Sequence, residues 1–215
     1  MTKTDQYYAV LTGDIIGSTS DRTPGLEGIQ DVLRDLNGDL GSKFSDTLIG
    51  SLDIFRGDSW QIGLRQPRSA LRVATYIRTF LISRLGVDTR IAIAIDTVER
   101  IVDGEISQSS GAAFVASGRH LDKHLGSAGF GLASGPVSSK HEPWMAVMLA
   151  LYDDLISELS SAQAEAVLIL LVNERLSQAE LGQRLGISQE AARKRLKSAH
   201  WPNIHSVIDL FEQVV

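Results

Sequence analysis

The order of strand-like and helix-like segments in the first 134 residues limits the fold of this chain more than any other feature of its sequence. Short apolar runs rich in strand-forming residues lie at 7–16, 48–55, 60–64, 89–96 and 129–134. Segments in which apolar residues recur every three or four positions lie at 26–44, 68–85 and 112–125. The predicted order is therefore strand, helix, two strands, helix, strand, helix, strand.

A sheet backed by helices is the simplest way to bury segments in this order. The run Arg56-Gly57-Asp58-Ser59 joins two of the strands as a tight hairpin. An antiparallel sheet with its helices on one face would bury all the apolar runs. This element order is typical of ferredoxin-like and polymerase palm-type domains. We therefore expect an α+β fold with a ferredoxin-like or palm-type antiparallel sheet.

The composition of the chain changes after residues 135–139, which contain glycine, proline and serine. From Trp144 onward every segment has helical spacing. We predict an α+β domain over 1–138, a connecting helix over 139–160, and an all-α domain over 161–215.

The overall composition is that of an ordinary globular protein. The 215 residues are 43% hydrophobic and 22% charged. The chain has no cysteine, which excludes disulfides and thiolate metal sites and fits a reducing compartment. We see no signal peptide and no apolar stretch of membrane-spanning length, so we expect a cytoplasmic protein without membrane contact. The net charge of −5 means that any binding of nucleic acid must come from a local basic patch.

Two glycine–aspartate pairs, Gly13-Asp14 and Gly57-Asp58, stand at the ends of predicted strands. Neither residue type favours a strand interior. If the first strand lies beside the hairpin, the two carboxylates are neighbours, and a bound Mg²⁺ or Mn²⁺ would remove their repulsion. Two such ions could clamp the attacking and leaving oxygens of a phosphoryl transfer. The simpler alternative is that each aspartate caps its own turn.

Phosphate groups of a nucleotide would need hydrogen-bond donors beside those ions. The turn Gly17-Ser18-Thr19 offers backbone N–H groups for this purpose. We therefore name Gly17, Ser18 and Thr19, together with Gly57 of the hairpin, as candidate nucleotide-binding positions.

The string Asp14-Ile-Ile-Gly-Ser-Thr, followed by a Gly-Asp hairpin, resembles the two metal motifs of class III nucleotide cyclase catalytic domains, over about residues 7–134. The resemblance implies that Asp14, the backbone carbonyl of Ile15 and Asp58 hold two metal ions, and that the ligand is a nucleoside triphosphate or another phosphate compound. It also implies a homodimer, because cyclase sites often lie at a dimer interface.

The resemblance further implies a role for one helix, over 114–121. Arg119 stands where cyclases place an arginine that stabilises the transition state, so it is the candidate catalytic residue. Val115 stands where cyclases have an asparagine. Loss of such a donor typically raises the barrier by about 3 kcal/mol. The resemblance therefore implies nucleotide or metal binding more strongly than turnover.

Three strings also resemble the SatD family of bacterial proteins, a likeness that implies no particular activity. They are Tyr-Tyr-Ala-Val-Leu-Thr-Gly-Asp-Ile-Ile-Gly-Ser at 7–18, Phe-Arg-Gly-Asp-Ser-Trp-Gln at 55–61, and Gly-Ala-Ala-Phe at 111–114.

The segment 176–197 has the pattern of a helix-turn-helix. Ser177 and Glu180 are spaced as a capping box, Gly186 suits the turn, and Ser188 can cap the second helix. The segment resembles the fourth region of bacterial sigma factors. The polar positions predicted to face DNA are Ser188, Gln189, Arg193, Lys194 and Lys197.

The charge of this region leaves a second interpretation open. Residues 160–215 contain six basic and six acidic side chains, although four of the basic ones lie within 193–197. A helical hairpin that only packs or dimerises would also fit this pattern.

Together these patterns predict a cytoplasmic transcription regulator in which a metal- and nucleotide-binding, cyclase-like domain is joined to a DNA-binding helix-turn-helix. One alternative is an active two-metal nucleotide cyclase or nucleotidyl transferase. The other is a non-catalytic scaffold for protein interactions.

Overall fold

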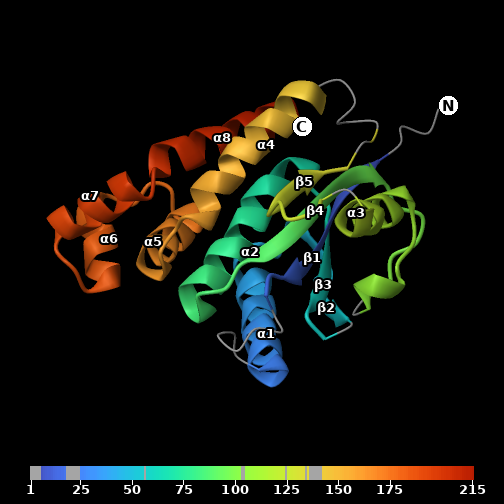
Figure 1. Ribbon diagram of the computed structural model, residues 1–215, viewed down its shortest axis with the longest axis horizontal. Coiled ribbons are helices and arrows are strands. Elements are labelled where there is room, and N and C mark those ends of the chain that lie inside the picture. The colour runs from blue at the N-terminus through green and yellow to red at the C-terminus, as the bar shows by residue number, and fades with distance from the viewer. Residues whose placement is uncertain are drawn as a thin grey trace.

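The structure is a computed structural model that describes residues 6–17, 25–55, 57–102, 105–123, 125–133, 135 and 142–215. These residues form five strands and eight α-helices (Figure 1). The strands are β1 (Tyr7–Ile15), β2 (Leu48–Phe55), β3 (Ser59–Leu64), β4 (Thr89–Thr97) and β5 (Phe130–Leu132). The helices are α1 (Leu26–Lys43), α2 (Ala70–Leu85), α3 (Ala112–Lys123), α4 (Glu142–Ser157), α5 (Ser161–Val172), α6 (Gln178–Leu185), α7 (Gln189–Ser198) and α8 (Trp201–Val214).

The predicted element order is confirmed, and the fold is of the α+β class. The strands form one sheet in the order β2-β3-β1-β4-β5, with β1 at its centre. β1 is antiparallel to both β3 and β4, and β2 pairs with β3 as an antiparallel hairpin. β5 runs parallel to β4, because the connection through α3 returns the chain in its original direction. The predicted antiparallel sheet was wrong for this one strand, and the sheet is mixed.

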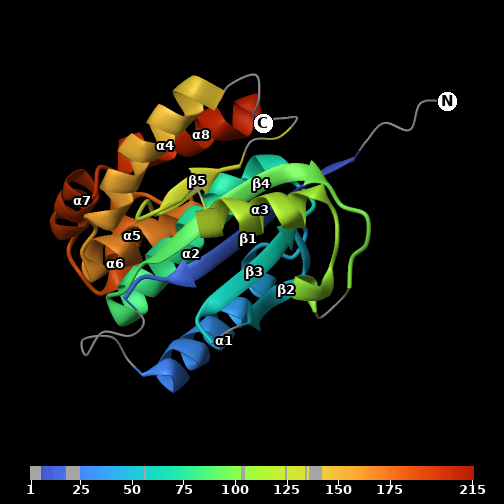
Figure 2. The ribbon, with the colours of Figure 1, turned by 45° about the vertical axis from the view of Figure 1, so that its right-hand side comes forward.

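Helices cover both faces of the sheet, so the prediction that they share one face was also wrong (Figure 2). Leu11 of β1 belongs to the large core beneath α1 and α2. Its neighbour Val10 points to the other face and packs with Phe114 of α3. Both side chains of β1 are completely buried. A strand buried on both faces is apolar at consecutive positions and does not alternate.

Helix α2 lies between the sheet and the C-terminal helices (Figure 1). From Ala70 to Ile82 it is buried at every position except Arg72. One continuous hydrophobic cluster extends from Ala9 of β1 through α2 to Phe211 of α8. The sheet and the C-terminal helices α4, α5 and α8 therefore share a core, whatever domain boundary the sequence suggests. Among the residues that the structure describes, no helix combines the length and the apolar character needed to cross a membrane.

A buried arginine fixes α4 to this core. The side chain of Arg78 on α2 is 1% exposed and donates hydrogen bonds to Asp88, with Nε 2.8 Å from Oδ1, and to Asp153 of α4. Its guanidinium carbon lies 4.3 Å from the ring centroid of Phe130. Burial acts to lower the pKa of Arg78, but the two carboxylates outweigh it, so the pKa is raised and the charge is kept.

Candidate functional site

The first glycine–aspartate pair lies on β1, and the second lies in the turn that leads into the neighbouring strand β3. In the β1–β3 ladder Asp14 is opposite Ser59, the residue that follows Asp58 in the hairpin. Gly13 is required here, because a Cβ at this position would lie 2.4 Å from the indole of Trp60. The pair therefore marks a point where two strands and a tryptophan pack closely together.

The carboxylate of Asp14 has a partner that the sequence analysis did not find. Arg90 lies opposite Asp14 on the other neighbouring strand, β4. The Nε of Arg90 donates to Oδ1 of Asp14 at 2.8 Å, and its Nη2 donates to Oδ2. The hydrogen bond to Asp14 is the main cause of a raised pKa at Arg90, with smaller contributions from the charges of Asp122 and Asp58.

This pairing decides how well the site suits a divalent cation. Carboxylates are the ligands that Mg²⁺ and Mn²⁺ prefer. Both oxygens of Asp14, however, accept hydrogen bonds from Arg90, so the guanidinium occupies the position that a metal ion would take. The residues present therefore do not fit a two-metal site in this arrangement. The roles of Asp14, Asp58 and the Ile15 carbonyl as ligands stay predictions.

Only some of the proposed nucleotide-binding positions can be placed. Gly17 has a φ of 70° and lies in the turn that follows β1. Ser18 and Thr19 lie outside the described residues. Gly57 has a φ of 87°, and its carbonyl accepts a hydrogen bond of 3.4 Å from the side chain of Gln30 on α1.

Among the described residues, the candidate catalytic residue forms no hydrogen bond or ion pair with either candidate carboxylate. Arg119 is exposed on α3 and, within the described ranges, forms no hydrogen bond or ion pair. Val115, one turn earlier, is 58% exposed. The inner side of α3 is fixed to the sheet instead, because the hydroxyl of Ser117 lies 2.8 Å from that of Thr12. Within the part of this single chain that the structure describes, Arg119 therefore makes no contact that links it to Asp14.

The helices α6 and α7 carry a second candidate site, at the end of the molecule farthest from α3 (Figure 1). Ser177 and Glu180 form the predicted capping box, with the backbone N–H of Ser177 donating to Glu180 at 2.8 Å. Gly186 ends α6 with a φ of 65°, and Ser188 caps α7 by accepting from the N–H of Ala191 at 3.1 Å. The caps and the glycine turn predicted for this pair of helices are confirmed.

The two helices are held close together by a small core. A Cβ on Gly182 would lie 2.8 Å from the carbonyl oxygen of Ile187, so only glycine fits there. Leu181 of α6 packs with Ala192 and Leu196 of α7 against Leu170 of α5. This packing fixes which side of α7 points outward. The residues on that outward side are all exposed, and they are Ser188, Gln189, Arg193, Lys194 and Lys197.

The acidic side chains of this region lie mostly away from the exposed side of α7. Arg72 of α2 binds Glu174 and Glu212, with its Nε 2.6 Å from Glu212, and it lies 3.7 Å from Asp209. Near the exposed side of α7, Glu190 forms an ion pair of 2.7 Å with Arg193 and lies 3.9 Å from Lys194. Residues 160–215 contain equal numbers of basic and acidic side chains, but on the exposed side of α7 the basic side chains predominate.

The acids around Arg72 also form the one group of potential metal ligands found among the described residues. Glu174, His205 and Asp209 have ligand atoms within 4.8 Å of one another. The guanidinium of Arg72 already binds Glu174 and approaches Asp209, and the Nδ1 of His205 lies 2.9 Å from Asp209, so these groups have partners within the protein. We therefore interpret this cluster as a structural contact between α2, the α5–α6 turn and α8.

Comparisons with known proteins do not assign the chain to a family. No model of a known protein family matches its sequence, and no functionally curated protein matches it.

Proposed function

We propose that this protein is a DNA-binding regulator in which α6 and α7 act as a helix-turn-helix. The observation that carries the proposal is the geometry of this pair, in which caps, glycine turn and core hold α7 with its polar side outward. In a helix-turn-helix the second helix enters the major groove, and the residues near its N-terminus contact base edges. In this chain that helix is α7.

The exposed side chains of α7 have the chemistry that such a role needs. Gln189 and Arg193 lie in its first half and can form paired hydrogen bonds with bases. Lys194 and Lys197 supply ammonium groups for phosphates, and Ser188 stands at the N-terminus of the helix. Glu190 holds Arg193 in the absence of DNA and would have to exchange it for a nucleic-acid partner.

The N-terminal part is best interpreted as a cyclase-like domain without turnover. The strand order β2-β3-β1-β4, with α1 and α2 on one face, supports the ferredoxin-like relationship. The Asp14–Arg90 pair and the exposed position of Arg119 favour a domain that binds a ligand, or passes a structural change to the C-terminal helices, over a domain that catalyses a reaction. Because α2 shares its core with α5 and α8, a change in this domain can reach α6 and α7 through direct packing.

Fluorescence anisotropy on a labelled 30-base-pair duplex of mixed sequence tests the proposal. The unmutated protein should bind with a Kd of about 10⁻⁶ to 10⁻⁴ M, and log K should fall as log salt rises. Arg193→Ala combined with Lys197→Ala should weaken binding and reduce the salt slope by about one phosphate contact, that of Lys197. Arg100→Ala, which removes an exposed arginine from the loop after β4, is the matched control. Absence of binding at about 50 mM salt, or equal binding by the double variant, would end the proposal.

A further inference from the structure

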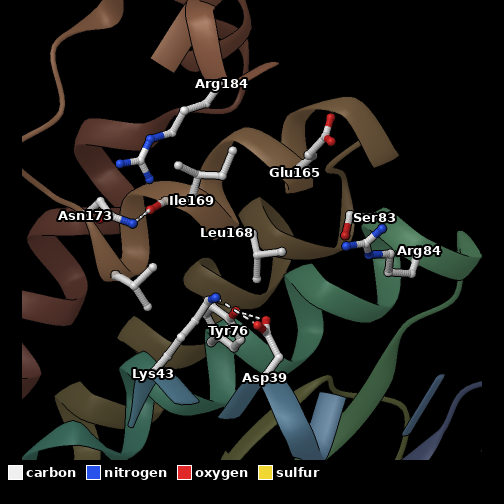
Figure 3. Close-up of a pocket in the computed structure, with 11 residues that line it drawn as sticks. Asp39, Lys43, Tyr76, Ser83, Arg84, Glu165, Leu168, Ile169, Asn173 and Arg184 are labelled. Carbon is white, nitrogen blue, oxygen red and sulfur yellow. Dashed lines mark hydrogen bonds and ion pairs between the residues drawn. The ribbon is translucent and has the colours of Figure 1, made fainter. Parts of the chain in front are cut away.

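A cavity of about 270 Å³ lies where the N-terminal domain meets the C-terminal helices. Its wall is made by α1 and α2 on one side and by α5 and α6 on the other (Figure 3). This volume lies near the lower end of the range for ligand pockets, so it suits a small molecule. None of the candidate residues named from the sequence lines it.

Three apolar side chains of α5 face this cavity: Leu168, Ile169 and Val172. Each is partly buried and packs against the hydrophobic core with its other side. The cavity thus offers an apolar wall on which the body of a ligand can lie.

Two charged groups on the α1 side are already satisfied. The Nζ of Lys43 lies 2.8 Å from Oδ1 of Asp39, and the hydroxyl of Tyr76 donates to Oδ2 of the same carboxylate. Glu165, on the α5 side, lies 3.7 Å from Arg195 of α7. The acidic groups of the lining are therefore balanced by cations of the protein itself.

Two arginines in the lining are not balanced in this way. Arg84 of α2 stacks on the ring of Phe80, with its guanidinium carbon 5.6 Å from the centroid. The hydrogen bonds from Ser177 and, to a lesser degree, the charge of Arg184 on α6 lower the pKa of Glu180. Over the described part of the chain, neither guanidinium forms a hydrogen bond or an ion pair. Figure 3 shows them on different sides of the cavity, with Leu168 and Ile169 between them.

We propose that this cavity binds a small organic dianion, with one anionic group on Arg84, the other on Arg184, and a short apolar body against α5. Guanidinium groups bind carboxylate and phosphate through paired hydrogen bonds, so both kinds of anionic group satisfy the site. Such a ligand joins α2 to α6 and thereby fixes the helix that precedes the turn of the α6–α7 pair. The proposal goes beyond DNA binding and does not depend on it.

Isothermal titration of the full chain with matched probes tests the site. The probes are the aliphatic dicarboxylates succinate, glutarate and adipate, with hexanoate as the monoanion, hexanamide as the neutral form, and 3-phosphonopropionate as the phosphorus-containing dianion. At least one dianion should bind about tenfold more tightly than hexanoate, and hexanamide should not bind. Comparing the affinity of the dicarboxylates with that of 3-phosphonopropionate identifies the anionic group that the site prefers.

Single substitutions then assign the two ends. Arg84→Gln and Arg184→Gln should each weaken the best dianion about tenfold while leaving hexanoate nearly unchanged at the remaining arginine. Arg100→Gln is the control, and melting curves without ligand establish that each variant is folded. The proposal is overturned if no dianion binds more tightly than hexanoate, or if both variants bind the dianion as the unmutated protein does. Since no DNA is present, neither result bears on the proposed function.

Discussion

The buried arginine on α2 gives the sharpest test of how the two parts of the chain are joined. Arg78 links α2 to the loop before β4 and to α4 through Asp88 and Asp153. The two carboxylates are only 17% and 16% exposed. In Arg78→Met, both would stay charged in a poorly solvated place without their cation. Removing one partner of a buried ion pair typically costs about 3–5 kcal/mol.

The measurement is urea unfolding followed by far-ultraviolet circular dichroism. We expect the free energy of unfolding of Arg78→Met to fall by about 4 kcal/mol, with a drop of about 10 °C in Tm. Adding Asp88→Asn and Asp153→Asn to this variant should restore much of the loss, because neutral amides are far cheaper to bury than unpaired carboxylates. Arg100→Met, at an exposed position, should change stability by less than about 0.5 kcal/mol. A loss below about 1 kcal/mol for Arg78→Met, or no recovery in the triple variant, would refute the reasoning.

Three further predictions concern other parts of the molecule. Gly182→Val should lower the free energy of unfolding by about 1–3 kcal/mol and abolish DNA binding, because its Cβ meets the carbonyl of Ile187; unchanged anisotropy titrations would contradict this. Burial, and for Tyr76 a hydrogen bond to a carboxylate, raises the pKa of the phenols of Tyr76 and Tyr152. The folded state then keeps protons that the unfolded chain releases above about pH 10, so stability should fall there by about 1.4 kcal/mol per pH unit per tyrosine. Urea titrations between pH 9 and 11 check this slope, which should be smaller in Tyr152→Phe. Finally, Arg90→Ala frees the β1 carboxylate and should give a protein that Mn²⁺ stabilises in thermal unfolding, whereas Mn²⁺ should leave the unmutated protein unchanged; equal responses would exclude the guanidinium as a substitute for a cation.

Local signals in the sequence predicted local structure well. The caps at Ser177 and Ser188 and the left-handed Gly186 depend only on neighbours within a few residues, and all three are present. The pairing of the first strand with the hairpin was also predicted correctly, because a tight hairpin leaves few ways to pair, and it brings Asp14 opposite the residue that follows Asp58.

Contacts between distant residues could not be predicted in the same way. Arg90 binds a carboxylate 76 positions earlier, and this requires the register between β1 and β4. The presence of Arg90 near the start of a strand with alternating apolar residues does not predict which residue of β1 lies opposite it. The position of α3 on the second face of the sheet was missed for a related reason, since only the burial of both Val10 and Leu11 makes it necessary.

The central position of α2 has a consequence for synthesis on the ribosome. The side of this helix that turns away from the sheet is covered by α5 and α8, which begin at Ser161 and Trp201. At ordinary translation rates, that apolar surface stays uncovered for on the order of ten seconds after α2 itself has emerged. During this interval the nascent chain exposes a continuous apolar helix surface. We expect a general chaperone that binds apolar segments to shield it. The part of the core that α2 shares with α8 therefore cannot form before Phe211 has left the exit tunnel.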